Sequence, residues 1–324
     1  MIKKLKKISF ITLPIALGVF LIWYSLSKLT NNDIQSIEES FRTANYWWVA
    51  LSLFFGVLSH LSRAYRWQFL LEPLGYKPRL ANSIMAVLIA YLLNLVIPRS
   101  GEVARAASIK KYENIPFKKA FGTIVAERVA DVIMLFSIIG VAFVLQTELI
   151  TSYLFKNGEE SSIYSKIIIF GIFPLLGFLF FRMLKKSQNN IAVKIVAFIN
   201  DLLDGIKSIY KMKKKWKFIF HTVFIWTMYV LMFYTVTFAL PETTNLPFAA
   251  IIVGFVVGGL SMALTNGGLG TYPIFVASAL ILYNVDDNPA RAFGWIMWTA
   301  QTIMVIIFGG LSFLLLPIYN KYQK

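Results

Sequence analysis

The chain has 324 residues, no cysteine and only two histidines, His60 and His221. Disulfide bonds, thiol catalysis and cysteine-ligated metals are therefore excluded, and a histidine-based metal site is not expected. Charge is also scarce, because 15% of the residues are Asp, Glu, Lys or Arg, against about 25% in soluble domains. No polar stretch reaches the length of a small soluble domain, roughly 50 residues. The sequence thus predicts no catalytic domain, no enzyme activity and no cofactor.

Apolar residues are abundant instead: 57% of the chain is hydrophobic, and the mean hydropathy is +0.65. This composition predicts an all-α polytopic integral membrane protein, with residues 1–324 forming a single transmembrane domain. The net charge is +16. Because the basic residues fall in loops, we interpret them as markers of topology and of contact with anionic lipid, and we expect no nucleic-acid partner.

Alternating loop charges predict the topology. Four lysines precede the first apolar run, which we interpret as an uncleaved anchor with a cytoplasmic N-terminus. Acidic loops at 30–46, 148–164 and 284–289 are expected outside, and the C-terminal lysines inside. The location that follows is a bacterial-type inner cell membrane. The six full spans are expected at 8–27, 47–70, 120–147, 165–181, 218–239 and 291–316.

Two further apolar segments are expected to form broken re-entrant hairpins of opposite polarity. Residues 80–109 have basic flanks on both sides and are interrupted by a proline, which cannot continue a helix. Residues 247–285 have external flanks and are interrupted by glycines. Such hairpins resemble the discontinuous helices of transporters; a plain eight-span count is the alternative. The residues expected at the breaks are Pro98, Gly101, Asn266, Gly267, Gly268, Gly270 and Thr271.

The segment 182–217 is strongly basic, with ten Lys and Arg against two Asp, and is expected in the cytoplasm. Within it, apolar residues recur at helical spacing, which predicts an amphipathic helix lying on the inner leaflet or packed on the protein. The stripe comprises Ile191, Ile195, Phe198, Leu202, Ile206 and Ile209.

Ionisable residues gather between 94 and 131, beside apolar runs. A charge at bilayer depth costs at least about 2.5–3.5 kcal/mol, so these side chains are expected to neutralise one another. Two interpretations stay open: a site for a charged or zwitterionic headgroup, in which arginine binds phosphate, or a structural salt-bridge network. The six residues are Arg99, Glu102, Arg105, Glu127, Arg128 and Asp131.

Two other elements contribute to the candidate site. The glycines in the run NGGLGTYP allow unusual backbone conformations and expose N–H groups. If a helix begins near Thr271, its N-terminus could face an anion. The alternative is a turn that allows close helix packing. Arg63 and Arg66 end the second span and are expected to extend towards lipid phosphates. With Asn94, they complete the candidate substrate-binding residues.

Four motifs, in order, resemble the lysylphosphatidylglycerol synthase transmembrane region family, also called the flippase-like domain family. They are R-A-x-R-W at 63–67, N-x3-P-R-x-G-E-x2-R-A at 94–106, E-R-x2-D at 127–131 and N-G-G-L-G-T-Y at 266–272. The resemblance implies lipid translocation. It argues against synthase activity, since no soluble aminoacyl-transfer domain is expected here. Pro273 stands where the family pattern has an acidic residue.

The predicted function is movement of a lipid or lipid-linked headgroup between leaflets. Arg99 and Arg105 would engage phosphate, while Glu102, Glu127 and Asp131 would engage a cationic headgroup or couple protons. The partner is a membrane phospholipid, with an anionic or aminoacylated headgroup, and a homo-oligomer or partner enzyme is also compatible. The alternatives are a non-transporting lipid-binding subunit that supports an enzyme, and a small-solute secondary transporter.

The topology is testable by cysteine labelling, because the chain has no cysteine of its own. Lys213→Cys should be protected from a membrane-impermeant maleimide in intact cells, and Asp286→Cys should react, since loop charge sets orientation. Both should react in permeabilised cells. Labelling of position 213 from outside would contradict the topology.

Overall fold

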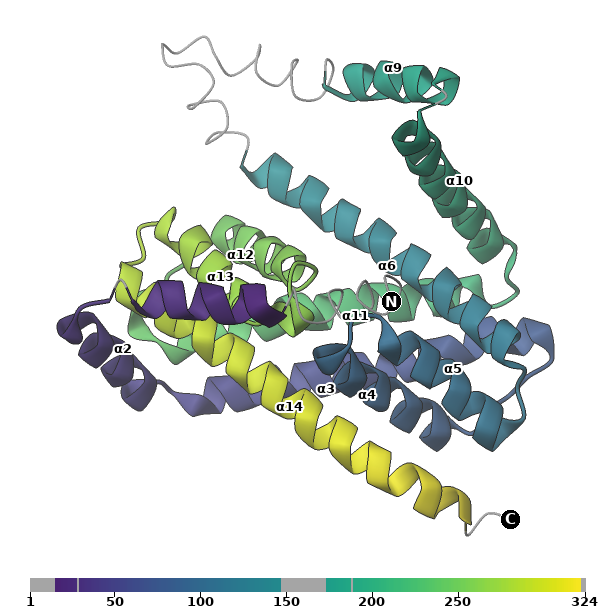
Figure 1. Ribbon diagram of the computed structural model, residues 1–324, viewed down its shortest axis with the longest axis horizontal. Coiled ribbons are helices and arrows are strands. Elements are labelled where there is room, and N and C mark those ends of the chain that lie inside the picture. The colour runs from purple at the N-terminus through teal and green to yellow at the C-terminus, as the bar shows by residue number, and fades with distance from the viewer. Residues whose placement is uncertain (1–14, 28, 147–172, 188, 322–324) are drawn as a thin grey trace, which may run out of the picture. The chain divides into compact units, whose positions relative to one another are not determined.

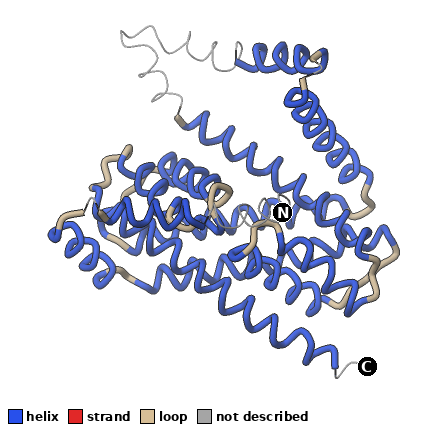
Figure 2. The backbone as a smooth tube through the Cα atoms, in the orientation of Figure 1, coloured by secondary structure: helices blue, strands red, loops and turns tan. Residues whose placement is uncertain are grey.

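The computed structural model describes residues 15–27, 29–146, 173–187 and 189–321, and these residues form helices and no strand (Figures 1 and 2). The protein is an all-helical membrane protein, as predicted. Its helices are Ile15–Leu26, α2 (Asn31–Thr43), α3 (Tyr46–Leu71), α4 (Leu80–Val96), α5 (Ser100–Glu113), α6 (Phe117–Leu145), α9 (Phe173–Lys186), α10 (Asn190–Lys211), α11 (Lys215–Val236), α12 (Phe248–Ser261), α13 (Thr271–Ile281) and α14 (Asp287–Lys321).

The chain divides into two compact units. Unit 1 holds residues 1–127 and 216–324, and unit 2 holds residues 128–215. In unit 2, the predicted amphipathic segment does contain a helix, α10, whose Ile191 is exposed. The side chains of Phe198, Leu202 and Ile206 in its stripe lie outside the described part of the chain. The N-terminal lysines, the loop 148–164 and the C-terminal Lys324 lie outside it as well.

Three helices are long and apolar enough to cross a membrane by length and composition. They are Phe117–Leu145, Lys215–Ala239 and Asp287–Lys321. The helices Ile15–Leu26, α4, α12 and α13 are apolar but shorter, between 10 and 17 residues. The long helices coincide with three of the predicted spans, and the shorter ones with the first span and with the two predicted hairpins.

One expected loop is a helix. Residues 31–43 form α2, which begins with a capping box at Thr30. The Thr30 side chain accepts a hydrogen bond from Asp33 N, and the Asp33 carboxylate accepts one from Thr30 N at 2.9 Å. This exchange satisfies backbone donors that a helix start leaves open. The sequence T-x-x-D at residues 30–33 is typical of a helix start. The segment was expected to be a loop because it contains few hydrophobic residues.

The first hairpin pairs α4 with α5 around a break at Ile97–Arg99. The Asn94 side-chain oxygen accepts a hydrogen bond from Gly101 N at 2.8 Å, which ties the two helices together across the break. A Cβ on Gly101 would lie 2.0 Å from the Ala90 carbonyl oxygen, so only glycine permits this close approach. Asn94 and Gly101 therefore shape the turn itself.

The second hairpin pairs α12 with α13, and α13 begins at Thr271 as predicted. In the intervening break, Gly267, Gly268 and Gly270 have positive φ, which glycine adopts readily. The Thr271 hydroxyl donates to the Ser261 carbonyl oxygen at 3.0 Å and lies 2.8 Å from the Thr265 hydroxyl. These side chains replace helical hydrogen bonds that the break removes, as a membrane interior requires.

Helix α14, drawn in yellow in Figure 1, contacts both hairpins. A Cβ on Gly294 would lie 2.5 Å from the Pro273 carbonyl oxygen at the start of α13. Further along α14, Gly309 packs against Leu92 of α4, and a Cβ there would lie 2.6 Å from the Leu92 Cβ. Small residues let membrane helices approach closely, and here they bring one long helix against both hairpins.

The adjacent glycines of α14 provide a matched test. Gly309→Ala should lower the melting temperature in detergent, because overpacking costs about 1–3 kcal/mol. Gly310→Ala should not, since nothing lies within 4 Å of its Cβ position and alanine favours a helix by about 0.5–1 kcal/mol over glycine. Fluorescence-detected size-exclusion after heating measures both. Equal stability of the two variants would contradict the close packing of α14 on α4.

Candidate functional site

A buried carboxylate, that of Glu127 on α6, holds three arginines in unit 1. Its Oε1 lies 2.8 Å from Arg63 Nη1 and 3.4 Å from Arg66 Nη2, and its Oε2 lies 2.9 Å from Arg105 Nη2. The side chain of Glu127 is 0% exposed, and those of the arginines at most 3%. Glu127, Arg63, Arg66 and Arg105 form the Glu127 cluster. Buried charges are tolerated in proteins when they are paired and hydrogen-bonded, and these four side chains meet that condition.

Neighbouring side chains orient the arginines of the Glu127 cluster. Arg66 Nη1 donates to the Thr222 hydroxyl of α11 at 2.8 Å. The Arg105 guanidinium lies 3.9 Å from the Trp67 ring centroid, a cation–π contact. Trp67 Nε1 in turn donates to the Thr123 hydroxyl at 2.9 Å. Helices α3, α5, α6 and α11 are therefore joined at one buried point.

The two hairpin breaks meet. The side-chain amide of Asn266, in the second break, donates to the Val96 carbonyl oxygen at the end of α4 at 3.0 Å. A Cβ on Gly267 would lie 2.5 Å from a methyl carbon of Leu95, so the glycine allows the approach. The Gly267 carbonyl oxygen accepts a hydrogen bond from Trp298 Nε1 of α14 at 2.8 Å. The second tip thus supplies a donor to the carbonyl at the end of α4, and α14 supplies a donor to the second tip.

The expectation that Arg63 and Arg66 extend towards lipid is wrong. Both are buried, and both form ion pairs with Glu127. Helix α3 continues for a further five residues beyond Arg66, which places the arginines inside the helical bundle. The sequence gives a run of apolar and basic residues, but it does not show which face of α3 meets α6.

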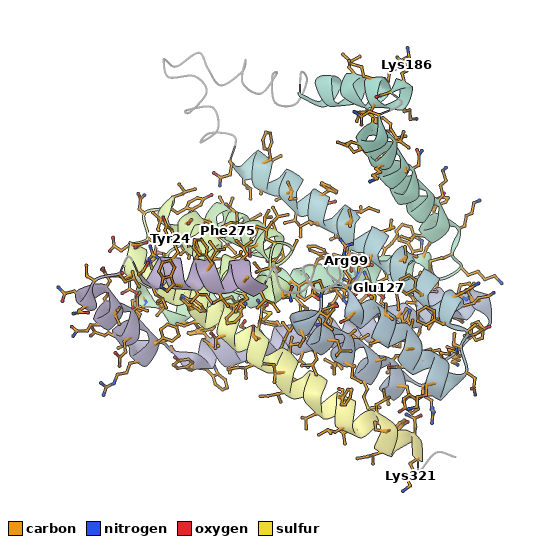
Figure 3. All side chains as sticks on the ribbon, in the orientation of Figure 1. Tyr24, Arg99, Glu127, Lys186, Phe275 and Lys321 are labelled. Atoms are coloured by element: carbon orange, nitrogen blue, oxygen red, sulfur yellow. The ribbon has the colours of Figure 1, made fainter. Side chains whose placement is uncertain are left out.

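The six ionisable residues between 94 and 131 do not form one cluster. Glu127 and Arg105 meet, but Arg99, labelled in Figure 3, is exposed and has left-handed backbone with φ 62°. Arg128 pairs with Asp131 in unit 2, with Nη1 and Oδ2 3.6 Å apart. Glu102 is partly buried. Two of the expected ion pairs therefore form within this segment, and the Glu127 carboxylate also pairs with two arginines of α3.

Two polar groups of unit 1 were not identified from the sequence. At one, Asn82 and Asn320 exchange amide hydrogen bonds of 3.0 and 2.8 Å, and Arg79 bonds Glu113 at 2.9 Å. At the other, His60 packs against a pair of tyrosines. A histidine or an asparagine in an apolar run only weakly indicates such a group. Nothing in the sequence indicates which residues on other helices it will contact.

The arrangement suits anion recognition, because guanidinium groups bind phosphate and carboxylate through paired N–H donors. Arg99 stands at the N-terminus of α5, where backbone N–H groups and the helix dipole favour negative charge. Within the described part of the chain, no group of three or more His, Asp or Glu gathers as a metal site.

Comparison with known proteins identifies relatives along almost the whole chain. A family model described as lysylphosphatidylglycerol synthase TM region matches residues 11–309. The chain is 24% identical over 299 residues to the UPF0104 membrane protein MJ1595 of Methanocaldococcus jannaschii, which covers 83% of this chain and 84% of that protein. It is 33% identical over 97 residues to the glycosyltransferase AglD of Haloferax volcanii, covering 30% of this chain and 16% of that protein. No solved structure matches.

Removing the carboxylate of the Glu127 cluster should destabilise the protein. Glu127→Gln leaves three buried arginines without their shared anion, and breaking a buried ion pair from one side costs about 3–5 kcal/mol. Asp131→Asn, the matched control, removes a carboxylate whose partner Arg128 is 42% exposed, so its loss should be smaller. Thermal unfolding in detergent measures both.

A second change tests the assignment of partners. Arg63→Gln combined with Glu127→Gln should recover part of the stability that Glu127→Gln loses, because the buried charge is then reduced. The same recovery from Arg99→Gln, an exposed residue, would contradict the pairing described here.

Proposed function

Because the chain belongs to the lysylphosphatidylglycerol synthase transmembrane region family, we propose that it moves a lipid or lipid-linked headgroup between membrane leaflets. The observation that carries this proposal is the meeting of two broken hairpins at Asn266 and Val96. Backbone that is neither helical nor paired is tolerated at membrane depth where it is covered by protein or lines a wet cavity. Discontinuous helices of this kind form substrate sites in transporters.

Helix lengths support the re-entrant hairpins. With 14 residues in α12 and 11 in α13, these helices rise about 21 and 17 Å, short of a hydrocarbon core of about 30 Å. Neither spans the membrane alone. We therefore propose six full spans plus two hairpins entering from opposite faces, with both termini in the cytoplasm and the protein in a bacterial-type inner membrane.

The proposed ligand is the phosphate of an anionic phospholipid headgroup. Arg99 is exposed at the first tip, and Arg105 follows six residues later on α5. A headgroup first held by Arg99 and by the N-terminus of α5 would then approach the Glu127 cluster. An aminoacylated headgroup would add a cation, for which Glu102 is the proposed partner. No enzyme activity and no nucleic-acid partner are proposed.

A second candidate function rests on the similarity to the glycosyltransferase AglD. The matched stretch covers 16% of that protein, so the similarity concerns a segment of it. Under this alternative, the chain binds a lipid-linked substrate in the membrane and supports a partner enzyme without moving lipid. A small-solute transporter is the third alternative, and leaflet exchange of lipid separates the first from the other two.

Purified protein in liposomes should exchange fluorescent phosphatidylglycerol between leaflets, measured by dithionite quenching of the accessible label. Arg99→Asn should abolish most of the exchange without lowering the melting temperature, because asparagine tolerates left-handed backbone and the side chain is exposed. Lys110→Asn is the matched control: it removes an exposed cation from the other end of α5 and should leave exchange intact.

Three labelled lipids distinguish the headgroup classes: phosphatidylglycerol, its lysyl ester and phosphatidylcholine. Exchange of the first two, but not the third, is the expected result. Absence of exchange for all three, with folded protein, would exclude a flippase for these lipids and favour the enzyme-supporting subunit.

A further inference from the structure

A buried histidine lies one helical turn from the Glu127 cluster, and the proposed function does not use it. His60 of α3 is 6% exposed, and its Nδ1 has no hydrogen-bond partner in the described part of the chain. Its ring centroid lies 4.2 Å from that of Tyr91 on α4 and 6.3 Å from that of Tyr229 on α11. The two tyrosine hydroxyls lie 3.0 Å apart. Buried polar atoms are nearly always hydrogen-bonded, so this nitrogen requires an explanation.

The groups around His60 are two tyrosine rings and one cation. Tyr91 and Tyr229 come from α4 and α11, and Arg63 carries a positive charge three residues further along α3. Residues three apart on a helix are neighbours. A proton on His60 would therefore place a second positive charge beside Arg63, whose carboxylate partner Glu127 is shared with Arg66 and Arg105.

We propose that His60 takes up a proton when an anionic headgroup binds to the arginines, so that proton and headgroup move together. The inference rests on the proposed function for the identity of the headgroup. A bound phosphate adds negative charge beside Arg63 and so offsets the repulsion that opposes a proton on His60. Binding free energies are reciprocal: if the anion favours the proton, the proton favours the anion by the same factor.

Histidine is the side chain suited to this task. It is the residue whose unperturbed titration falls between pH 5 and 8, and intramembrane histidines serve in the proton relays of transporters. Glu127 is less suited, because its deprotonated form holds three arginines in place. Protonating it would remove the anion on which the packing of α3, α5 and α6 depends.

The chain offers a clean test, because it contains only two histidines. The other, His221, lies 2.9 Å from the Ser62 hydroxyl and is partly exposed. Purified protein in weakly buffered detergent with a pH indicator is mixed with phosphatidylglycerol. Wild type and His221→Gln should take up protons on binding the lipid, and His60→Gln should lose this uptake. His60→Asn provides a second variant, and size-exclusion chromatography confirms that each is folded.

A spectroscopic readout needs no change at position 60. In His221→Gln, the ring resonances of labelled histidine come from His60 alone, and they should move towards imidazolium values when phosphatidylglycerol is added. Unchanged resonances, proton uptake by His60→Gln equal to wild type, or no uptake by wild type would each overturn the proposal. Proton uptake without leaflet exchange in liposomes would instead leave the role of His60 standing and refute the flippase function.

Discussion

The carboxylate of Glu127 is the interaction on which unit 1 depends. Three guanidinium groups from α3 and α5 lie inside an apolar bundle, where each would be costly without an anion. The single carboxylate satisfies them with ion pairs of 2.8, 2.9 and 3.4 Å. Because its partners come from separate helices, the charge fixes how α3, α5 and α6 meet. The cation–π contact on Trp67 and the hydroxyl of Thr222 then orient the arginines.

Local chemistry made much of the fold predictable. Proline and clustered glycine disfavour a continuous helix, so breaks after Val96 and before Thr271 were expected from the residues themselves. The helix α2 was also within reach of the sequence, because Thr30 and Asp33 stand at the spacing of a capping box. The low apolar content of this segment suggested a loop, but the segment forms a helix that begins with this capping box.

The partners in the candidate site were not predictable in the same way. Helical spacing relates residues three or four apart, whereas Arg63 and Glu127 are 64 positions apart. From the sequence, Arg99 was also grouped with Glu102 and Arg105. The break after Pro98 leaves Arg99 in left-handed backbone instead, which separates it from the face that carries Arg105. Prediction failed where contacts cross between helices or where the backbone departs from a helix.

Helix α14 has a mechanical consequence. It packs against α13 near Gly294 and against α4 near Gly309, and its Trp298 holds the carbonyl of Gly267. The second tip, in turn, holds the end of α4 through Asn266. The three elements form a closed loop of contacts, so tilting one hairpin away from the other would disrupt contacts with α14. Each contact that α14 makes with one hairpin therefore also constrains the position of the other.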